Sequence, residues 1–389
     1  MKILLVIPTL LGGGAERVVV ILSQAFVDKG HDVTIITLSG KDTDFYHLPI
    51  GVTRIALDIL KDSSNIIDGL RGNFRKSLML RNAVCKLNPD VVISHLNSTN
   101  VLTIISLLNS GYPVIVTEHS HPKINLMGTI WTALRRLTYP YANKVVSVSQ
   151  GVSDAFDWLP SHLKSVIYNP FRSIPHKPTY IDIPPGADIG KKWIISMGRF
   201  VHAKGFDILL PAFASIIAKH QDWQLIILGD GELREELEKL KENLGLSTQA
   251  ILPGAVKNPF PILQAAKLFV MSSRNEGFPM APGEALACGL PVISTDCPSG
   301  PSEIIRSGID GILVPTEDVS ALAFAMDSLM SNEEERQRLA SFAPEVTTRF
   351  SLEKIVENWE SLIEEVIKNK SDKINLKKLN QHKIKSTKK

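Results

Sequence analysis

The sequence predicts an α/β protein made of two doubly wound domains, each a parallel sheet with helices on both faces. The length of 389 residues is too great for one ordinary domain and suits two. Apolar runs alternate with glycine-containing loops and amphipathic segments, which is the pattern of strand–loop–helix units. A proline-rich stretch, residues 169–186, interrupts this pattern and is not expected to hold a regular element.

We place the domain boundaries around this stretch. Residues 351–369 predict one more amphipathic helix, and the lysine-rich end of the chain is expected to be disordered. The expected division is a first domain at 1–172, a linker at 173–186, a second domain at 187–350, the terminal helix at 351–369 and the tail at 370–389.

Composition points to a globular protein of a reducing compartment. Hydrophobic residues make up 44% and charged residues 21% of the chain, as in soluble globular proteins. The cysteines, Cys85, Cys288 and Cys297, show neither metal spacing nor a disulfide framework. No apolar run approaches the roughly 18 residues that cross a bilayer, and the short apolar N-terminus reads as a buried strand. We therefore expect a cytoplasmic protein whose membrane contact, if any, is peripheral.

The charge is unevenly distributed. Residues 1–172 carry 17 Lys and Arg against 12 Asp and Glu, whereas residues 187–350 carry 15 against 21. The tail has eight lysines and one aspartate. A basic first half and tail favour contact with an anionic surface such as the inner membrane. The tail has no aromatic side chains for base stacking, so nucleic acid is not expected as a partner; a solvated tail is the alternative.

In the first domain, the opening strand leads into a glycine loop and an amphipathic helix. Glycine lets the backbone approach a phosphate, which makes Gly13 and Gly14 candidates, although a tight turn has the same composition. Residues 39–80 look irregular, apart from a basic helix that either meets acceptor phosphates or lipid headgroups or is simply solvated. Its basic residues are Arg71, Arg75, Lys76 and Arg81. The expected elements are strands 2–8, 31–38, 90–94, 114–117 and 144–149 and helices 15–26 and 131–139.

Polar side chains follow the strands of this domain. His95 ends one strand, and Glu118 and His119 end the next. Because the carboxyl ends of parallel strands border the ligand crevice, these groups are candidates for the site, with a structural histidine as the alternative. On the helix 131–139, Arg135 and Arg136 either bind a diphosphate acceptor or support packing.

In the second domain, a loop carries Arg199 and Lys204 directly after a strand. Two fixed cations match the charge of a diphosphate, whereas two solvated side chains are the plainer interpretation. The expected elements are strands 193–197, 225–228, 251–256, 268–271, 290–294 and 310–314, and helices 206–219, 232–244, 284–287 and 319–330.

Two carboxylates, Glu276 and Glu284, bracket a loop and the first turn of a short helix, with seven residues between them. Carboxylates accept hydrogen bonds from sugar hydroxyls, and a helix N-terminus favours phosphate. Two surface glutamates flanking a turn would show the same spacing, so the pair alone is weak. The run from 268 to 295 is more specific: it closely resembles the E-x7-E segment of retaining glycosyltransferases of family 4, which have the GT-B fold.

Three further motifs resemble the same family in the same order. They are GGAER at the first loop, TEHS at a strand end and the GR/KG loop of the second domain. The resemblance implies that Glu276 contacts the donor sugar and Glu284 the ribose, with the loop of Gly277, Phe278 and Pro279 nearby. It implies that His119 reaches the donor sugar. The remaining implied roles are diphosphate binding by Arg199 and Lys204, phosphate contact by Gly13 and Gly14, and loop or acceptor contact by Glu16, Arg17, Arg75 and Arg135.

The resemblance implies a retaining transfer of a hexose or N-acetylhexosamine from a nucleotide-diphosphate sugar to a glycan acceptor. It implies no metal and no cofactor, and a terminal helix that packs back on the first domain. The GGAER loop and the basic first half favour a polyprenyl-diphosphate-linked acceptor of surface-glycan assembly, and a UDP-sugar is our hypothesis for the donor. A GT-B epimerase acting on a UDP-sugar and a non-catalytic nucleotide-sugar-binding protein are the alternatives.

Overall fold

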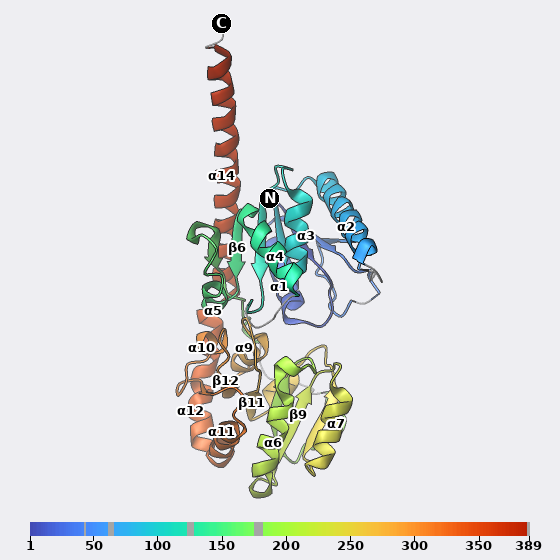
Figure 1. Ribbon diagram of the computed structural model, residues 1–389. Helices are drawn as coiled ribbons and strands as arrows, with labels where there is room; N and C mark the ends of the chain where they lie inside the picture. The colour runs from blue at the N-terminus through green and yellow to red at the C-terminus, as the bar shows by residue number, and fades with distance from the viewer. Residues whose placement is uncertain (43, 61–65, 123–127, 175–181, 387–389) are drawn as a thin grey trace.

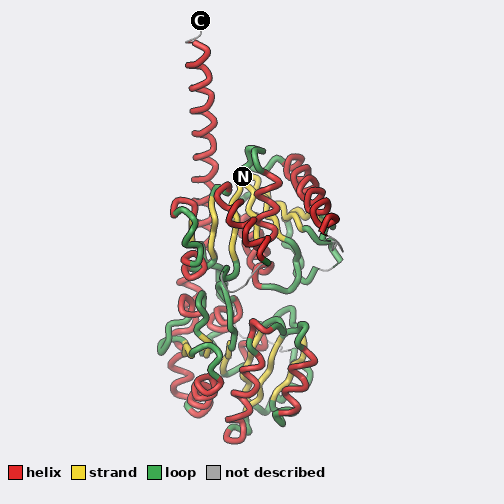
Figure 2. The backbone as a smooth tube through the Cα atoms, in the orientation of Figure 1, coloured by secondary structure: helices red, strands yellow, loops and turns green. Residues whose placement is uncertain are grey.

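The computed structural model describes residues 1–42, 44–60, 66–122, 128–174 and 182–386. Two α/β halves are stacked end to end, and a long C-terminal helix runs beside the N-terminal half and projects beyond it (Figure 1). Each half holds one sheet enclosed by helices (Figure 2). Part of the expected linker, residues 175–181, lies outside the described residues.

The N-terminal half contains a seven-stranded parallel sheet in the order β3-β2-β1-β4-β5-β6-β7. The order reverses between the neighbouring strands β1 and β4, which creates the switch point where such sheets bind ligands. The strands are β1 (Lys2–Ile7), β2 (Asp32–Thr37), β3 (Val52–Ala56), β4 (Val91–His95), β5 (Val114–Glu118), β6 (Lys144–Ser147) and β7 (Lys164–Val166).

Residues 39–80 were expected to be irregular outside one helix, but they also contain the strand β3. It pairs with β2 along its whole length, from Val52 beside Val33 to Ala56 beside Thr37. Its side chains are only partly buried, because β3 lies at the edge of the sheet. Its five residues, VTRIA, mix apolar and polar side chains and so lack the continuous apolar run by which the central strands were found.

The C-terminal half contains a six-stranded parallel sheet in the order β10-β9-β8-β11-β12-β13, with its switch point between β8 and β11. All six strands were expected within a few residues. They are β8 (Lys192–Met197), β9 (Trp223–Leu228), β10 (Ala250–Gly254), β11 (Leu268–Met271), β12 (Val292–Thr295) and β13 (Gly311–Val314).

Helices cover both faces of each sheet. Those of the first half are α1 (Gly14–Asp28), α2 (Ile66–Leu87), α3 (Asn97–Leu107), α4 (Thr129–Thr138) and α5 (Gln150–Asp154). Those that follow are α6 (Phe206–Ile216), α7 (Arg234–Asn243), α8 (Phe260–Ala265), α9 (Met280–Ala287), α10 (Pro301–Ile304), α11 (Val319–Ser331), α12 (Glu333–Phe342), α13 (Val346–Arg349) and α14 (Leu352–Ser386).

Helix α14 packs back on the N-terminal half, as expected. Its apolar stripe, which includes Trp359 and Ile363, is buried in a core cluster shared with α1 and β1. At the rim of this contact, His31 Nε2 lies 2.8 Å from Glu360 Oε1. The helix continues to Ser386, so the expected disordered tail is helical; this stretch has neither Gly nor Pro, and Lys, Leu and Gln favour helix.

Aromatic side chains join the two halves where the chain crosses between them. Phe171 stacks on Phe278 with ring centroids 5.8 Å apart, and Phe350 packs edge-on against both. Tyr168 contacts Phe278 and Phe350 from the other side. This cluster holds the loop after β11 against the N-terminal half, and so places the two sets of loops opposite each other.

Candidate active site

A cleft of about 830 Å³ lies between the halves. Loops after β1 and β5 line it from the N-terminal half, and loops after β8, β9, β10 and β11 line it from the C-terminal half. These are the carboxyl ends of the strands of both sheets, where ligands of open parallel sheets bind. The predicted site residues that line the cleft are Gly13, Gly14, Glu16, Arg17, His119, Arg199, Lys204, Glu276, Gly277, Phe278, Pro279 and Glu284.

The loop after β8 brings a cation against the first of the two glutamates. Lys204 Nζ lies 2.5 Å from Glu276 Oε1, and Ser273 Oγ donates to the same oxygen at 2.7 Å. Ser299 Oγ donates to the backbone oxygen of Glu276 at 2.6 Å. The carboxylate is therefore held in one position, and its second oxygen is left for other partners.

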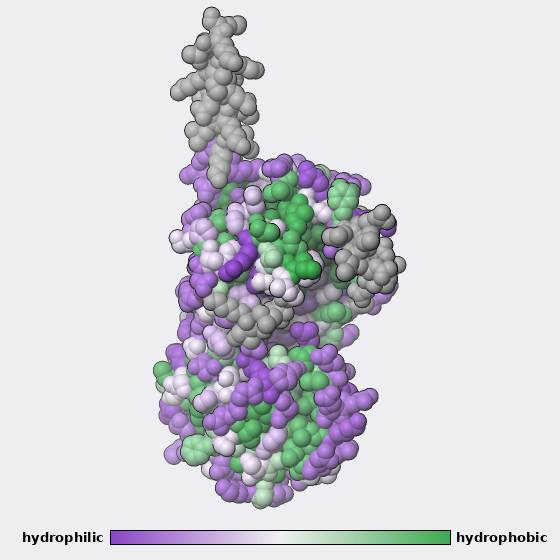
Figure 3. Space-filling view, viewed as in Figure 1, coloured by the Kyte–Doolittle hydropathy of each residue, from purple (hydrophilic) through white to green (hydrophobic). Residues whose placement is uncertain are grey.

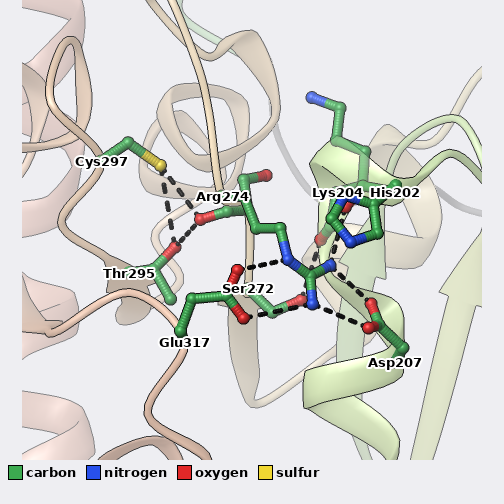
Figure 4. Close-up of polar contacts among 9 residues, drawn as sticks. His202, Lys204, Asp207, Ser272, Arg274, Thr295, Cys297 and Glu317 are labelled. Atoms are coloured by element: carbon green, nitrogen blue, oxygen red, sulfur yellow. Dashed lines mark hydrogen bonds and ion pairs between the residues drawn. The ribbon is translucent and has the colours of Figure 1, made fainter. Parts of the chain in front are cut away.

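An arginine behind this pair ties the two loops together (Figure 4). The Arg274 guanidinium lies between two carboxylates, with Nη1 2.7 Å from Asp207 and Nε 2.5 Å from Glu317. It also donates to the backbone oxygen of His202 at 2.8 Å. In Figure 4 the Lys204 ammonium extends away from this network. The network thus braces the backbone near the lysine, while the ammonium group, paired with Glu276, faces the cleft.

The second glutamate pairs with an arginine of the other half. Arg17 Nε, on α1, lies 2.8 Å from Glu284 Oε1, on α9, and the Arg17 guanidinium lies 5.2 Å from the Phe260 ring centroid. Desolvation raises the pKa of Glu284 to about 7, although the charge of Arg17 lowers it in part. This pair spans the cleft floor, so a ligand that binds Glu284 also meets the N-terminal half.

The first glycine loop forms the facing wall. Gly13 precedes α1, and its backbone oxygen accepts a hydrogen bond from Tyr46 at 3.3 Å. Glu16 turns back to accept a hydrogen bond from Thr9 at 3.2 Å, and desolvation raises its pKa. Glu16 thus stabilises the loop itself, one of its two predicted roles.

Two histidines from neighbouring strands meet at the cleft wall. His95 Nδ1 lies 3.0 Å from His119 Nε2, so one ring donates to the other. Burial lowers the pKa of His119 to about 4 and that of His95 well below its usual range, and the proximity of the two rings adds to the shift of His95. Both rings are therefore neutral near pH 7, and His119 can act there as a hydrogen-bonding group rather than as a cation.

Behind them, Glu118 is fully buried and accepts a hydrogen bond from the Tyr139 hydroxyl. Desolvation raises the pKa of Glu118 to about 7, against the opposing effects of Tyr139 and Arg135. It does not line the cleft. Glu118 is therefore a structural group behind the site.

Glutamine at position 118 should flatten the pH dependence of stability. Glu118 titrates near 4.5 when unfolded and at about 7 when folded, so the native state binds more protons between these values. Its contribution to stability is thus present below pH 4.5 and lost as the pH rises to 7, and Glu284 acts in the same direction. In the wild type this contribution to the free energy of unfolding falls by roughly 3 kcal/mol between pH 5 and pH 8. We expect the Glu118→Gln variant to lack this fall when its free energy of unfolding is measured with urea at the two pH values. If the free energy of unfolding of Glu118→Gln changes with pH as steeply as that of the exposed control Glu353→Gln, the raised pKa of Glu118 is contradicted.

Two predicted acceptor residues do not reach the cleft. Arg135 is only 4% exposed, donates to the backbone oxygen of Pro122 and lies over the Phe156 ring, which is the packing alternative. The structure therefore places Arg135 in the packed core, away from the cleft lining. Arg75 is exposed on α2, outside the cleft lining. The Arg71 side chain lies outside the described residues.

Phe278 contributes differently from its predicted donor contact. It borders the cleft, but its ring is 4% exposed and is stacked in the aromatic cluster between the halves. Three residues of the site were not predicted from the sequence: Ser273, Tyr46 and Asn169. The Nδ2 atom of Asn169 lies 3.4 Å from the Phe278 backbone oxygen. No motif marks these residues; of the three, Ser273 alone had a signal, its place three residues before Glu276.

Two doubly wound halves facing across a cleft define the GT-B class of glycosyltransferases. The profile of "Glycosyl transferases group 1" matches residues 182–346, and that of "Glycosyltransferase Family 4" matches residues 12–172. An alpha-1,4-N-acetyl-D-galactosaminyltransferase of Campylobacter jejuni, named for a PP-undecaprenol-linked acceptor, is 30% identical over 367 residues, covering 94% of this chain and 99% of the relative. The chain belongs to glycosyltransferase family 4 and is a hexosyltransferase.

Further relatives agree. A second Campylobacter jejuni protein, an N-acetylgalactosaminyltransferase named for a diphospho-undecaprenol acceptor, is 26% identical over 338 residues, 84% of this chain and 89% of the relative. Among solved structures, Anabaena HepE in complex with UDP superposes with a TM-score of 0.76 at 19% identity, covering 94% of this chain and 100% of HepE. Sucrose-phosphate synthase from Thermosynechococcus elongatus superposes with a TM-score of 0.78 at 18% identity, covering 95% of this chain and 100% of the synthase. These structures establish the GT-B fold.

Proposed function

We propose that this enzyme transfers a hexose or N-acetylhexosamine from a UDP-sugar, with retention of configuration, to a polyprenyl-diphosphate-linked glycan. One observation carries the proposal. A single cleft gathers cations, two carboxylates and a neutral histidine from both halves around about 830 Å³, which is the size of ordinary small-molecule sites. The donor part of this cleft, with Lys204, Glu276 and Glu284, belongs to the C-terminal half.

The departing nucleotide gains negative charge as the sugar bond breaks. Arg199 and Lys204 stabilise this charge on the diphosphate, and the glycine-loop amides of Gly13 and Gly14 add donors from the facing wall. Glu276 hydrogen-bonds the donor sugar through the oxygen that Lys204 and Ser273 leave free, and Glu284 accepts from the ribose. His119, neutral near pH 7, contacts the sugar from the N-terminal half. In this scheme the reaction needs neither a metal nor a cofactor.

Retention is proposed to arise by attack from the same face as the leaving group, with a donor phosphate oxygen taking the acceptor proton. A covalent route of the glycosidase kind would need a carboxylate nucleophile. Glu276 is poorly suited to that role, because Lys204 and Ser273 both engage its Oε1. Hydrogen bonds and a paired cation lower the nucleophilicity of a carboxylate.

The acceptor is proposed from the two Campylobacter jejuni relatives, both of which are named for undecaprenol-linked diphosphate acceptors. The basic N-terminal half is consistent with an anionic acceptor. Such an acceptor is anchored in a membrane, so the enzyme would work as a peripheral protein on the cytoplasmic face. No helix among the described residues has the length and apolar character that crossing a bilayer requires.

An activity screen tests the proposal. Purified enzyme is given UDP-hexoses, UDP-N-acetylhexosamines or GDP-mannose together with a polyprenyl-diphosphate-linked glycan, and nucleotide release and product are measured. We expect turnover with a UDP-sugar and an α-linked product by NMR, the configuration of the donor. Turnover with GDP-mannose alone would remove the UDP assignment. A β-linked product would remove retention, and isomerisation of the sugar nucleotide without acceptor would reveal an epimerase.

A further inference from the structure

Three neighbouring helices of the N-terminal half expose large apolar side chains to solvent. Helix α3 packs between α2 and α4 over one face of the sheet, and Arg81 on α2 donates to the backbone oxygen of Ser106 on α3 at 3.0 Å. The exposed side chains are Phe74 and Leu78 on α2, Ile105 and Leu108 at the end of α3, and Ile130 and Leu137 on α4; we call them the α2–α4 face.

These exposures are large. Ile130 is 76%, Leu137 68% and Phe74 68% exposed, values that a solvated helix seldom shows for several apolar side chains together. Figure 3 shows the resulting apolar area over α3 and α4 of the N-terminal half. The spacing of Phe74 and Leu78 by four, and of Ile130 and Leu137 by seven, places each pair on one side of its helix.

The described side chains of these three helices carry charges of one sign. Residues 72–87, 97–108 and 129–141 contain no Asp or Glu, whereas α2 and α4 contribute Arg75, Lys86 and Arg136, all exposed. An ordinary solvated helix surface mixes both signs, as α7 and α12 do in the same chain. Apolar side chains interleaved with cations, without carboxylates, match the boundary between acyl chains and anionic headgroups.

The α2–α4 face adjoins the cleft. Helix α3 starts directly after Leu96, and α4 is the next helix after β5, whose end is followed by His119 and His121; these three residues line the cleft. In Figure 1 both helices begin at the edge of the N-terminal half that faces the other half. A surface in contact with this face therefore lies beside the cleft mouth.

We propose that the α2–α4 face docks the enzyme on an anionic lipid bilayer, with apolar side chains entering the headgroup boundary and cations meeting the phosphates. This deepens the proposed function and rests on it, because docking there presents a membrane-anchored acceptor to the cleft. A protein partner or a second copy of this chain would be served by apolar side chains alone, whereas the carboxylate-free, cation-rich surround complements anionic headgroups.

Vesicle flotation of the full chain tests the proposal. We expect binding to vesicles containing phosphatidylglycerol, weaker binding to phosphatidylcholine vesicles, and loss of the difference as salt rises from about 0.05 to 0.5 M. The double variant Ile130→Asn/Leu137→Asn should bind phosphatidylglycerol vesicles at least about tenfold more weakly. Phe324→Asn is the matched control, since Phe324 is equally exposed, at 77%, on α11 of the other half; it should bind as wild type does.

Activity on a water-soluble, short-chain diphosphate acceptor separates this proposal from the proposed function. The double variant should keep wild-type turnover on that acceptor and lose turnover on acceptor embedded in vesicles. Equal vesicle binding by the double variant and wild type overturns the docking surface. So does a wild-type dimer that the double variant dissociates, which would assign the face to a second copy. Vesicle binding without any sugar transfer would retain the surface and remove the proposed function.

Discussion

Methionine at position 204 is expected to lower kcat/KM for the nucleotide sugar by about 10²–10³-fold. Methionine keeps most of the volume of lysine and removes the ammonium group that lies 2.5 Å from Glu276 Oε1. In the proposed reaction that ammonium group neutralises the diphosphate as it departs, an interaction that strengthens in the transition state. The loss should therefore appear mainly in kcat, measured by nucleotide release at saturating donor.

The chain offers a matched control on β8, the strand that precedes the loop of Lys204. Lys192 is the first residue of β8, at the end of the strand that points away from the cleft. Its ammonium group lies 3.0 Å from Asp222. Lys192→Met removes a comparable ion pair without touching the cleft, and exposed pairs contribute only about 0–1 kcal/mol to stability. We expect this variant to keep wild-type kinetics. Full activity of Lys204→Met would show that another group receives the leaving nucleotide.

The second sheet and most of the first could be read from the sequence, because buried central strands are continuous apolar runs between glycine-containing loops. The strands that escaped the analysis, β3 and β7, are both at edges of the first sheet, and their side chains are only partly buried. The side chains of an edge strand are only partly covered by the rest of the protein, so an edge strand need not be a continuous apolar run. The local sequence therefore carries little of the information that specifies them.

The parts of the candidate site that depend on residues of a single sheet could be predicted from the sequence. Lys204 and Glu276 follow neighbouring strands of one sheet, so the topology alone brings their loops together. The Arg17–Glu284 pair joins different halves and depends on how the halves are set against each other, which no local pattern encodes. The position of Arg135 could not be predicted for a related reason: the sequence places it on a helix, but the burial that turns its side chain inward is a property of the packed core.

The close approach of the two halves at Gly277 leads to the second prediction, a large loss of activity. Gly277 lies on the loop between β11 and α9, and a Cβ built on it would meet the backbone oxygen of His119 in the other half. Both contacting groups are backbone, held by β5 on one side and by the aromatic cluster on the other, so neither can move aside cheaply. Alanine at position 277 must therefore separate the two cleft walls at the position of His119.

We expect Gly277→Ala to reduce kcat by about 10²-fold, the usual cost of displacing a positioned group by about 1 Å. The two cations proposed to bind the diphosphate, Arg199 and Lys204, both lie on the C-terminal half, so affinity for UDP measured by calorimetry should change by less than about fivefold. Gly72→Ala is the control, because a Cβ there meets nothing within 4 Å and alanine suits a helix interior. If Gly277→Ala retains wild-type kcat, closure of the walls at His119 is not needed for transfer; if it loses UDP affinity in parallel with kcat, the glycine serves the donor site itself and not the junction between the halves.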